Sequence, residues 1–155
     1  MPKGLQAEIK QTKPFPSRAT EALLSILRTA AVLDHQLGEA LRPHRVTPTQ
    51  YNVLRILRGA GAGGLCGREI AERMIARVPD VPRLLERLEA MQLIRRERDP
   101  RDRRHVTARI APKGLALLTA VGPATEAVAR SRLGRLSERT LVGLIEGLTA
   151  VRDGS

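Results

Sequence analysis

Residues 95–110 place the tightest constraint on the fold, because they combine a turn signal with an alternating apolar pattern. The segment Asp99-Pro100-Arg101-Asp102 lies near their centre. Asp followed by Pro favours a turn, because Asp accepts hydrogen bonds from the backbone ahead of it and Pro presets φ. After the turn, Val106, Ala108 and Ile110 alternate with polar residues, which is the period of a half-buried strand. These signals predict a short antiparallel β-hairpin with arginines at its tip.

The charge of this hairpin indicates what it contacts. Six arginines lie between residues 95 and 104, against three acidic residues. Arg101, Arg103 and Arg104 suit a phosphate backbone or the minor groove of DNA, where negative potential attracts arginine. The alternative is a solvent-exposed hairpin whose arginines pair with its own acids. The rest of the sequence decides between these two interpretations.

The excess positive charge of the chain lies in its middle. The formal net charge of the whole chain is +11. Residues 42–113 carry seventeen Lys and Arg against eight acids, or +9, while residues 1–41 and 114–155 each carry five against four, or +1. A basic segment between nearly neutral ends is typical of nucleic-acid binding. A non-specific basic DNA-binding protein would share this charge, but it would not need long, neutral, apolar flanks.

Aromatic residues are scarce, since Phe15 and Tyr51 are the only Phe, Tyr or Trp in the chain. The core must therefore consist of Leu, Ile, Val and Ala, which suits packed helices. Single-stranded nucleic acid is a poor ligand for such a chain, because its bases stack on aromatic rings. The single cysteine, Cys66, excludes an internal disulfide. Because no apolar run has transmembrane length and no signal peptide is recognisable, we expect a cytoplasmic protein without a membrane partner.

Apolar residues at three- and four-residue intervals predict helices along most of the chain. We expect a single domain over residues 17–155, preceded by a flexible arm at residues 1–16. The predicted helices are residues 17–42, 47–59, 65–74, 79–92, 112–136 and 137–152, the fifth being kinked or interrupted at Gly122-Pro123.

Start signals mark several of these helices. The segment Thr47-Pro48-Thr49-Gln50 combines a capping residue, a proline suited to the first helical position and the glutamine of a capping box. Cys66 occupies the cap position of the third helix, with Glu69 three residues on, and Pro79 fits the first position of the fourth. Two short helices joined by a tight turn and followed by a basic hairpin predict a winged helix-turn-helix at about residues 47–111.

The flanking helices, at about residues 17–42 and 112–152, are apolar and nearly neutral overall. Their apolar faces must be buried, and a second copy of the chain is the economical partner. A symmetric dimer would also place two DNA-reading modules on two half-sites. The predicted fold class is therefore mainly α, with a small β-hairpin wing and with dimerisation helices at both ends.

The chain resembles the MarR family of bacterial transcriptional regulators over residues 23–151. The resemblance rests on T-P-T-Q-Y-N-V-L at 47–54, R-E-I-A-E-R-M at 68–74, V-P-R-L-L-E-R-L-E at 81–89, L-I-R-R-E-R-D-P-R-D-R-R at 93–104 and A-P-K-G-L-A-L-L at 111–118. All of these segments occur in order and at the family's spacing. The fourth contains the family's wing motif, Asp-x-Arg-Asp-x-Arg. Two residues depart from the pattern, since Pro82 and Ala111 stand where the family often has Thr.

The resemblance implies a homodimer that grips a pseudo-palindromic operator in double-stranded DNA. It places the helix at residues 79–92 in the major groove and the wing in the adjacent minor groove. Many members release DNA when a phenolic or other lipophilic small molecule binds between the dimerisation and DNA-binding parts, and others respond to thiol oxidation or to a metal. We therefore expect a sequence-specific repressor relieved by an effector. The scarcity of aromatic residues argues against a typical phenol-binding pocket.

The candidate DNA contacts lie on the predicted reading helix, on the wing and near their borders. Arginine can bond guanine through two parallel hydrogen bonds, which suits the first turn of a reading helix. We expect DNA contacts from Arg77, Arg83, Arg87, Arg101, Arg103, Arg73 and Thr49, the last two through phosphates. Arg87 has an alternative role, in which it pairs with Glu86, Glu89 or a wing acid.

Two further groups of residues have expected roles. Asp99, Asp102 and Arg104 are expected to shape the wing, with Arg104 pairing with one of the two acids. Cys66 lies at a predicted helix N-terminus near Arg68, an environment that favours the thiolate. A thiol-redox regulator acting through Cys66 is therefore an alternative, and a small capping residue is the simpler interpretation.

Other classes of site find no support in the sequence. His35, His44 and His105 are far apart and lack a Cys or carboxylate cluster at ligand spacing, so neither a metal site nor a cofactor is expected. The sequence shows no Gly-rich phosphate loop and no Ser/His/Asp or Cys/His constellation. We therefore expect a regulator and not an enzyme.

Overall fold

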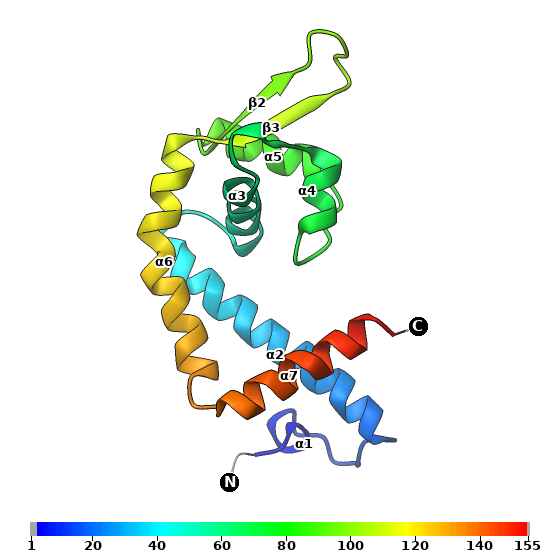
Figure 1. Ribbon diagram of the computed structural model, residues 1–155. Helices are drawn as coiled ribbons and strands as arrows, with labels where there is room; N and C mark the ends of the chain where they lie inside the picture. Colours follow the sequence, from blue (N-terminus) through cyan, green and yellow to red (C-terminus); the bar gives the residue numbers. More distant parts are fainter. Residues whose placement is uncertain (1–2, 155) are drawn as a thin grey trace.

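The computed structural model describes residues 3–154, which form helices and one small sheet. In chain order the elements are α1 (Leu5–Glu8), α2 (Arg18–Leu41), the 3-10 helix η1 (Arg42–His44), α3 (Pro48–Ala60), the 3-10 helix η2 (Gly61–Gly63), β1 (Leu65–Cys66), α4 (Gly67–Arg73), α5 (Val81–Ala90), β2 (Ile94–Arg98), β3 (Val106–Ile110), α6 (Pro112–Leu133) and α7 (Glu138–Arg152). The mainly helical fold with a hairpin wing is confirmed. Figure 1 shows α3, α4, α5 and the sheet at one end, α1, α2 and α7 at the other, and α6 running between them.

The core lies inside the winged helix-turn-helix, around α3. Its fully buried large side chains come from the end of α2, from α3, α4 and α5, from the start of the wing and from α6; they are Leu41, Val53, Leu54, Leu57, Ile70, Leu88, Leu93, Ile94 and Val121. The predicted capping box at the start of α3 is confirmed. Thr47 Oγ1 accepts the Gln50 N–H at 3.1 Å, and Gln50 Oε1 accepts the Thr47 N–H at 3.0 Å.

The sheet has one strand more than the sequence predicts. Its order is β1-β3-β2, with both pairs antiparallel. Residues 65–66, predicted as the start of a helix, pair instead with β3, where Leu65 lies opposite Ala108. Two residues are too few to show the alternation of a strand. Gly64, at φ +67, permits the close approach, because a Cβ there would collide with the carbonyl oxygen of Ala108.

The start of α5 also differs from the prediction. The sequence favours Pro79 in the first helical position, but α5 begins at Val81 and Pro79 precedes it. Asp80 is the N-cap, since its Oδ1 accepts the Arg83 N–H at 3.0 Å. Pro82 lies in the first turn, where its missing N–H costs no helical hydrogen bond. An Asp cap and a proline two residues later therefore outweigh the earlier proline.

The sequence predicts that Gly122-Pro123 kinks or interrupts the helix, and the interruption is wrong. The helix runs unbroken from Pro112 to Leu133 with Pro123 inside it. The residue before a proline is normally forced out of the helical region by a clash that involves its Cβ. Gly122 has no Cβ, which reduces this clash. The helix ends at Leu133, before the predicted Leu136, and Ser137 caps α7 by accepting the Thr140 N–H at 3.2 Å.

Within residues 3–16, the described part of the predicted flexible arm, there is one element. Leu5–Glu8 form the single-turn helix α1, which the sequence does not predict because four residues carry no usable periodicity. Ile9, just after it, is exposed. Within the described residues, no helix is both long and apolar enough to cross a membrane.

Replacing Ala111 with serine is expected to raise the free energy of unfolding by about 1 kcal/mol. Ala111 is the N-cap of α6 in extended conformation, and it offers no side-chain acceptor to the first turn. A serine hydroxyl there can accept the N–H three residues on, as Ser137 does for α7. Urea unfolding should show a higher midpoint with an unchanged slope. The control is Ala116→Ser, at an exposed position within α6, which should not raise the midpoint; an equal gain in both variants would contradict the capping explanation.

Candidate nucleic-acid interface

Helix α5 turns one face to the core and the other to solvent. Its buried residues are Val81, Leu84, Leu85 and Leu88. Arg83, Glu86 and Arg87 are exposed on the other face. Arg83 and Arg87 line a shallow hollow next to the turn that precedes the helix. Among the described residues neither arginine forms an ion pair, so the alternative in which Arg87 pairs with an acid is not what the structure shows.

The wing is shaped by its two aspartates through backbone contacts. Asp99 Oδ1 accepts the Arg101 N–H at 2.8 Å, and Asp102 Oδ1 accepts the Arg104 N–H at 3.0 Å. Arg104 therefore bonds Asp102 through its backbone N–H. The ion pairs of the described residues do not include the expected pairing of the Arg104 side chain with Asp99 or Asp102. The guanidinium groups of Arg101 and Arg103 are exposed, on the hairpin that projects from the body in Figure 1.

Two arginines brace the wing, and neither is among the residues that the sequence singles out. Arg109 on β3 donates from Nε to the carbonyl oxygen of Ala62 at 2.8 Å and from Nη1 to Glu97 at 2.8 Å. Arg96 on β2 binds Glu89 of α5 through side chain and backbone. Ala62 is 47 residues from Arg109 along the chain, and Glu89 is 7 residues from Arg96. No local pattern distinguishes these arginines from exposed ones.

The remaining candidate contacts fall in two places. Arg73 is exposed at the end of α4, and Arg77 is exposed in the turn between α4 and α5. Thr49 lies elsewhere, on the first turn of α3, where it lines a pocket with Asp34 of α2 and Ala76 of the turn. The structure therefore does not bring Thr49 to the outward face of α5.

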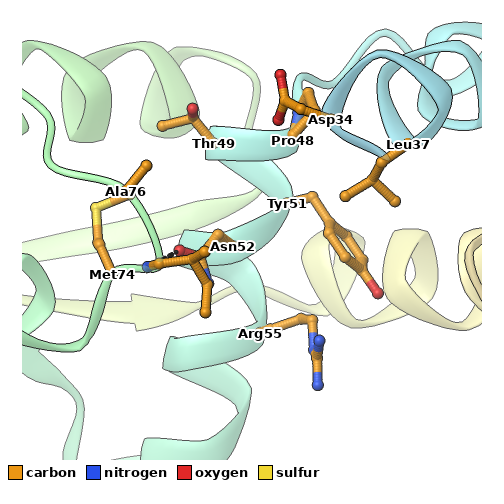
Figure 2. Close-up of a pocket in the computed structure, with 10 residues that line it drawn as sticks. Asp34, Leu37, Pro48, Thr49, Tyr51, Asn52, Arg55, Met74 and Ala76 are labelled. Atoms are coloured by element: carbon orange, nitrogen blue, oxygen red, sulfur yellow. Dashed lines mark hydrogen bonds between the residues drawn. The ribbon is translucent and has the colours of Figure 1, made fainter. Parts of the chain in front are cut away.

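The pocket around Thr49 has a volume of about 140 Å³ and lies between α2, α3 and the α4–α5 turn. Figure 2 shows its lining side chains. Asn52 Oδ1 accepts the Ile75 N–H at 2.9 Å and thus ties the turn to α3. The Arg55 guanidinium carbon lies 5.8 Å from the centre of the Tyr51 ring. Asn52 is not among the candidate residues of the sequence, because its partner is 23 residues away.

Cys66 has the predicted cap position. It is half-buried, and its backbone N–H donates to Glu69 Oε2 at 2.8 Å. This hydrogen bond lowers the pKa of Glu69. A redox role for Cys66 stays a prediction, which the peroxide response of Cys66→Ser tests. Among the described residues, no group of three or more His, Cys, Asp or Glu side chains is placed to hold a metal ion.

The end of the molecule opposite the wing exposes large apolar side chains. Leu23 and Leu27 on α2 are 56% and 58% exposed, and Ile145 and Val151 on α7 are 62% and 65% exposed. None of the residues of α7 is buried. An amphipathic helix without a buried residue lacks the cover that normally stabilises it. The apolar faces of these two helices therefore require a partner surface.

Comparison with known proteins agrees with this geometry. The MarR family model matches residues 46–106, which contain α3 to the start of β3. The transcriptional regulator HosA of Escherichia coli O111:H- is 30% identical over 112 residues, which cover 66% of this chain and 82% of HosA. Two solved structures have the same fold. Sco3205, a MarR family regulator from Streptomyces coelicolor in complex with DNA, has a TM-score of 0.79, 24% identity and coverage of 93% of this chain and 92% of its own.

The second structure is BpsR from Bordetella bronchiseptica, whose DNA binding is regulated by 6-hydroxynicotinic acid. Its TM-score is 0.78 at 23% identity, with coverage of 92% of this chain and all of its own, 100%. The reading helix, the wing and their order along the chain are those expected of a winged helix-turn-helix. The chain thus belongs to the MarR family, and it is a DNA-binding transcriptional regulator, not an enzyme.

Proposed function

We propose that this regulator is a homodimeric repressor that binds a pseudo-palindromic operator and releases it when a small effector binds. The observation that carries the proposal is the set of exposed arginines without acidic partners on α5 and the wing. In this arrangement α5 enters the major groove with Arg83 and Arg87, and the wing brings Arg101 and Arg103 to the adjacent minor groove. Arg77 and Arg73 contact the phosphates beside the reading helix.

The exposed apolar faces of α2 and α7 support the homodimer. A second copy of the same surface would cover these faces around a two-fold axis. The two reading helices would then meet two half-sites of the same duplex, which explains why the operator should be a pseudo-palindrome. The DNA complex of Sco3205, which shares the fold, supports DNA as the ligand.

The pocket beside the α4–α5 turn is the proposed effector site. It is small, and its wall combines apolar side chains with the polar groups of Asp34, Thr49, Asn52 and Arg55. A ligand that donates a hydrogen bond to Asn52 Oδ1 would displace the Ile75 N–H from it. The turn that positions α5 would then lose its hydrogen bond to α3. The regulation of BpsR by 6-hydroxynicotinic acid supports a small-molecule effector for this chain as well.

Fluorescence anisotropy tests the central proposal. DNA from upstream of the protein's own gene is compared with scrambled DNA of equal length across a salt series. We expect the operator to bind about 10³-fold or more tightly than scrambled DNA. A steep salt dependence without such a gap would require a genome-wide selection of bound fragments. If that selection enriches no palindrome, the protein binds non-specifically and the operator proposal is overturned.

A further inference from the structure

We propose that Glu89 is a positioning residue for DNA reading, because with Arg96 it fixes the wing relative to the reading helix. The inference rests on the proposed operator binding, in which α5 and the wing contact the duplex together. Neither residue is offered as a DNA contact. The proposed role is to fix the angle between α5 and the wing, because the two must reach two adjacent grooves at once.

The contact between the two residues uses both oxygens of the carboxylate. Glu89 Oε2 accepts the backbone N–H of Arg96 at 2.9 Å. Oε1 accepts the Arg96 side chain, from Nη2 at 3.0 Å and from Nε at 3.3 Å. A single carboxylate therefore holds the main chain and the side chain of the same wing residue. Charge-assisted bonds of this kind are stronger and more directional than neutral ones.

The position of Arg96 in the sheet explains why this contact sets an angle. Strand β2 is an edge strand, since the sheet order is β1-β3-β2, and Arg96 lies opposite Ala108 at the middle of the β2–β3 ladder. The backbone N–H of Arg96 bonds to Glu89, on the side of β2 away from β3. Glu89 thus supplies the hydrogen-bond acceptor that a neighbouring strand would otherwise provide for the Arg96 N–H. It anchors the wing to α5 at the middle of β2, in addition to the covalent Met91–Leu93 connection.

The electrostatics of the site support a role distinct from DNA contact. The side-chain hydrogen bond from Arg96 lowers the pKa of Glu89, so the carboxylate is charged at neutral pH. The Arg96 side chain is only 23% exposed, unlike the exposed arginines of the wing tip. The hollow between α5 and the wing is lined by this pair together with Glu86, Arg98 and Val106. The guanidinium charge of Arg96 is therefore paired with Glu89 within the chain and is not presented to DNA.

Glu86 provides a matched control for Glu89. It lies one turn earlier on α5, borders the same hollow and has no ion pair among the described residues. Glu89→Gln and Glu86→Gln each remove one negative charge from the same region. A general gain in DNA affinity from the removal of that charge will therefore appear in both variants. An effect on the wing will appear only at Glu89.

The experiment uses the full-length protein and an operator selected by the wild type from a random duplex library. Hydroxyl-radical footprinting first identifies the base pairs next to the wing. Each base pair is then substituted and its effect on binding measured for every variant. In the wild type, substitutions beside the wing should weaken binding by about tenfold. In Glu89→Ala the same substitutions should weaken binding by less than about twofold, while those beneath α5 keep their wild-type effect.

Further variants separate positioning from general damage. Glu89→Gln keeps an amide oxygen that can accept the Arg96 N–H. We therefore expect it to retain part of the preference at the base pairs next to the wing. The double variant Glu89→Ala/Arg96→Ala should be no worse than Glu89→Ala alone, because the two residues act through one contact. Amide hydrogen exchange at Arg96 should be faster in Glu89→Ala than in Glu86→Gln. If Glu89→Ala does not fold, Glu89→Gln alone decides the outcome.

The failures of the two proposals are distinguishable. A wild type that selects no palindrome overturns the proposed function and this assignment with it. A wild type that selects one, with an unchanged substitution profile in Glu89→Ala and Glu89→Gln, overturns only the positioning role. A uniform loss of affinity at all base pairs would also overturn it, because a merely structural residue gives that result.

Discussion

Replacing Ile145 with glutamate is expected to convert the regulator to a monomer and to weaken operator binding by about 10²–10⁴-fold. Ile145 is 62% exposed on α7, a helix with no buried residue. In the proposed dimer it is covered by the partner, and a carboxylate there would be buried without a counter-charge. The loss in affinity is large because two half-sites bound by one dimer become two independent binding events. Sedimentation velocity and anisotropy with the selected operator measure the two effects.

Leu115→Glu is the matched control for Ile145→Glu. Leu115 is also an exposed apolar residue, at 43%, but it lies near the start of α6, at the end of the molecule that carries the wing. The same chemical change there should leave the protein dimeric. Ile145→Glu should sediment as the 17.0 kDa chain, and Leu115→Glu as twice that mass. A dimeric Ile145→Glu with wild-type affinity would show that α7 does not contribute to the interface.

Replacing Arg83 with alanine is expected to weaken the free energy of operator binding by about 1–3 kcal/mol for each half-site. Arg83 lies in the first turn of α5, its backbone is held by the Asp80 cap, and its side chain is exposed. A guanidinium placed there can bond the edge of one guanine through two parallel hydrogen bonds. The wild-type dimer makes this interaction twice, so operator affinity should fall by about 30-fold to 2 × 10⁴-fold in total.

The signature of Arg83→Ala is a change in preference at one base pair of each half-site. Wild-type protein should discriminate against substitution of that base pair, and the variant should not. Arg101→Ala, on the wing tip, should instead reduce the preference at the base pairs beside the wing, where Arg101 is proposed to enter the minor groove, and leave the preference at the Arg83 base pair unchanged. Arg135→Ala removes the same charge in the loop between α6 and α7 and should change little. A uniform loss of affinity in Arg83→Ala would assign Arg83 to the phosphate backbone.

Much of the fold was predictable because its signals are local. The capping box at residues 47–50 depends on four consecutive residues, and both of its hydrogen bonds form. The turn at Asp99-Pro100 and the alternation that ends at Ile110 are likewise properties of neighbours in the chain, and they give β2 and β3. One error came from competing local signals, because the Asp80 cap and Pro82, and not Pro79, set the start of α5. Another came from tertiary pairing, because residues 65–66 pair with β3.

The roles of individual arginines could not be predicted in the same way. Arg96 and Arg101 belong to one basic run, yet the first is bound to Glu89 and the second is exposed to solvent. Asn52 and Ile75 meet only because α3 and the α4–α5 turn pack together. An ion pair or hydrogen bond between distant residues needs its two partners within about 3 Å. Residue order does not encode that distance, so packing alone separates the arginines that hold the wing from those that remain available for DNA.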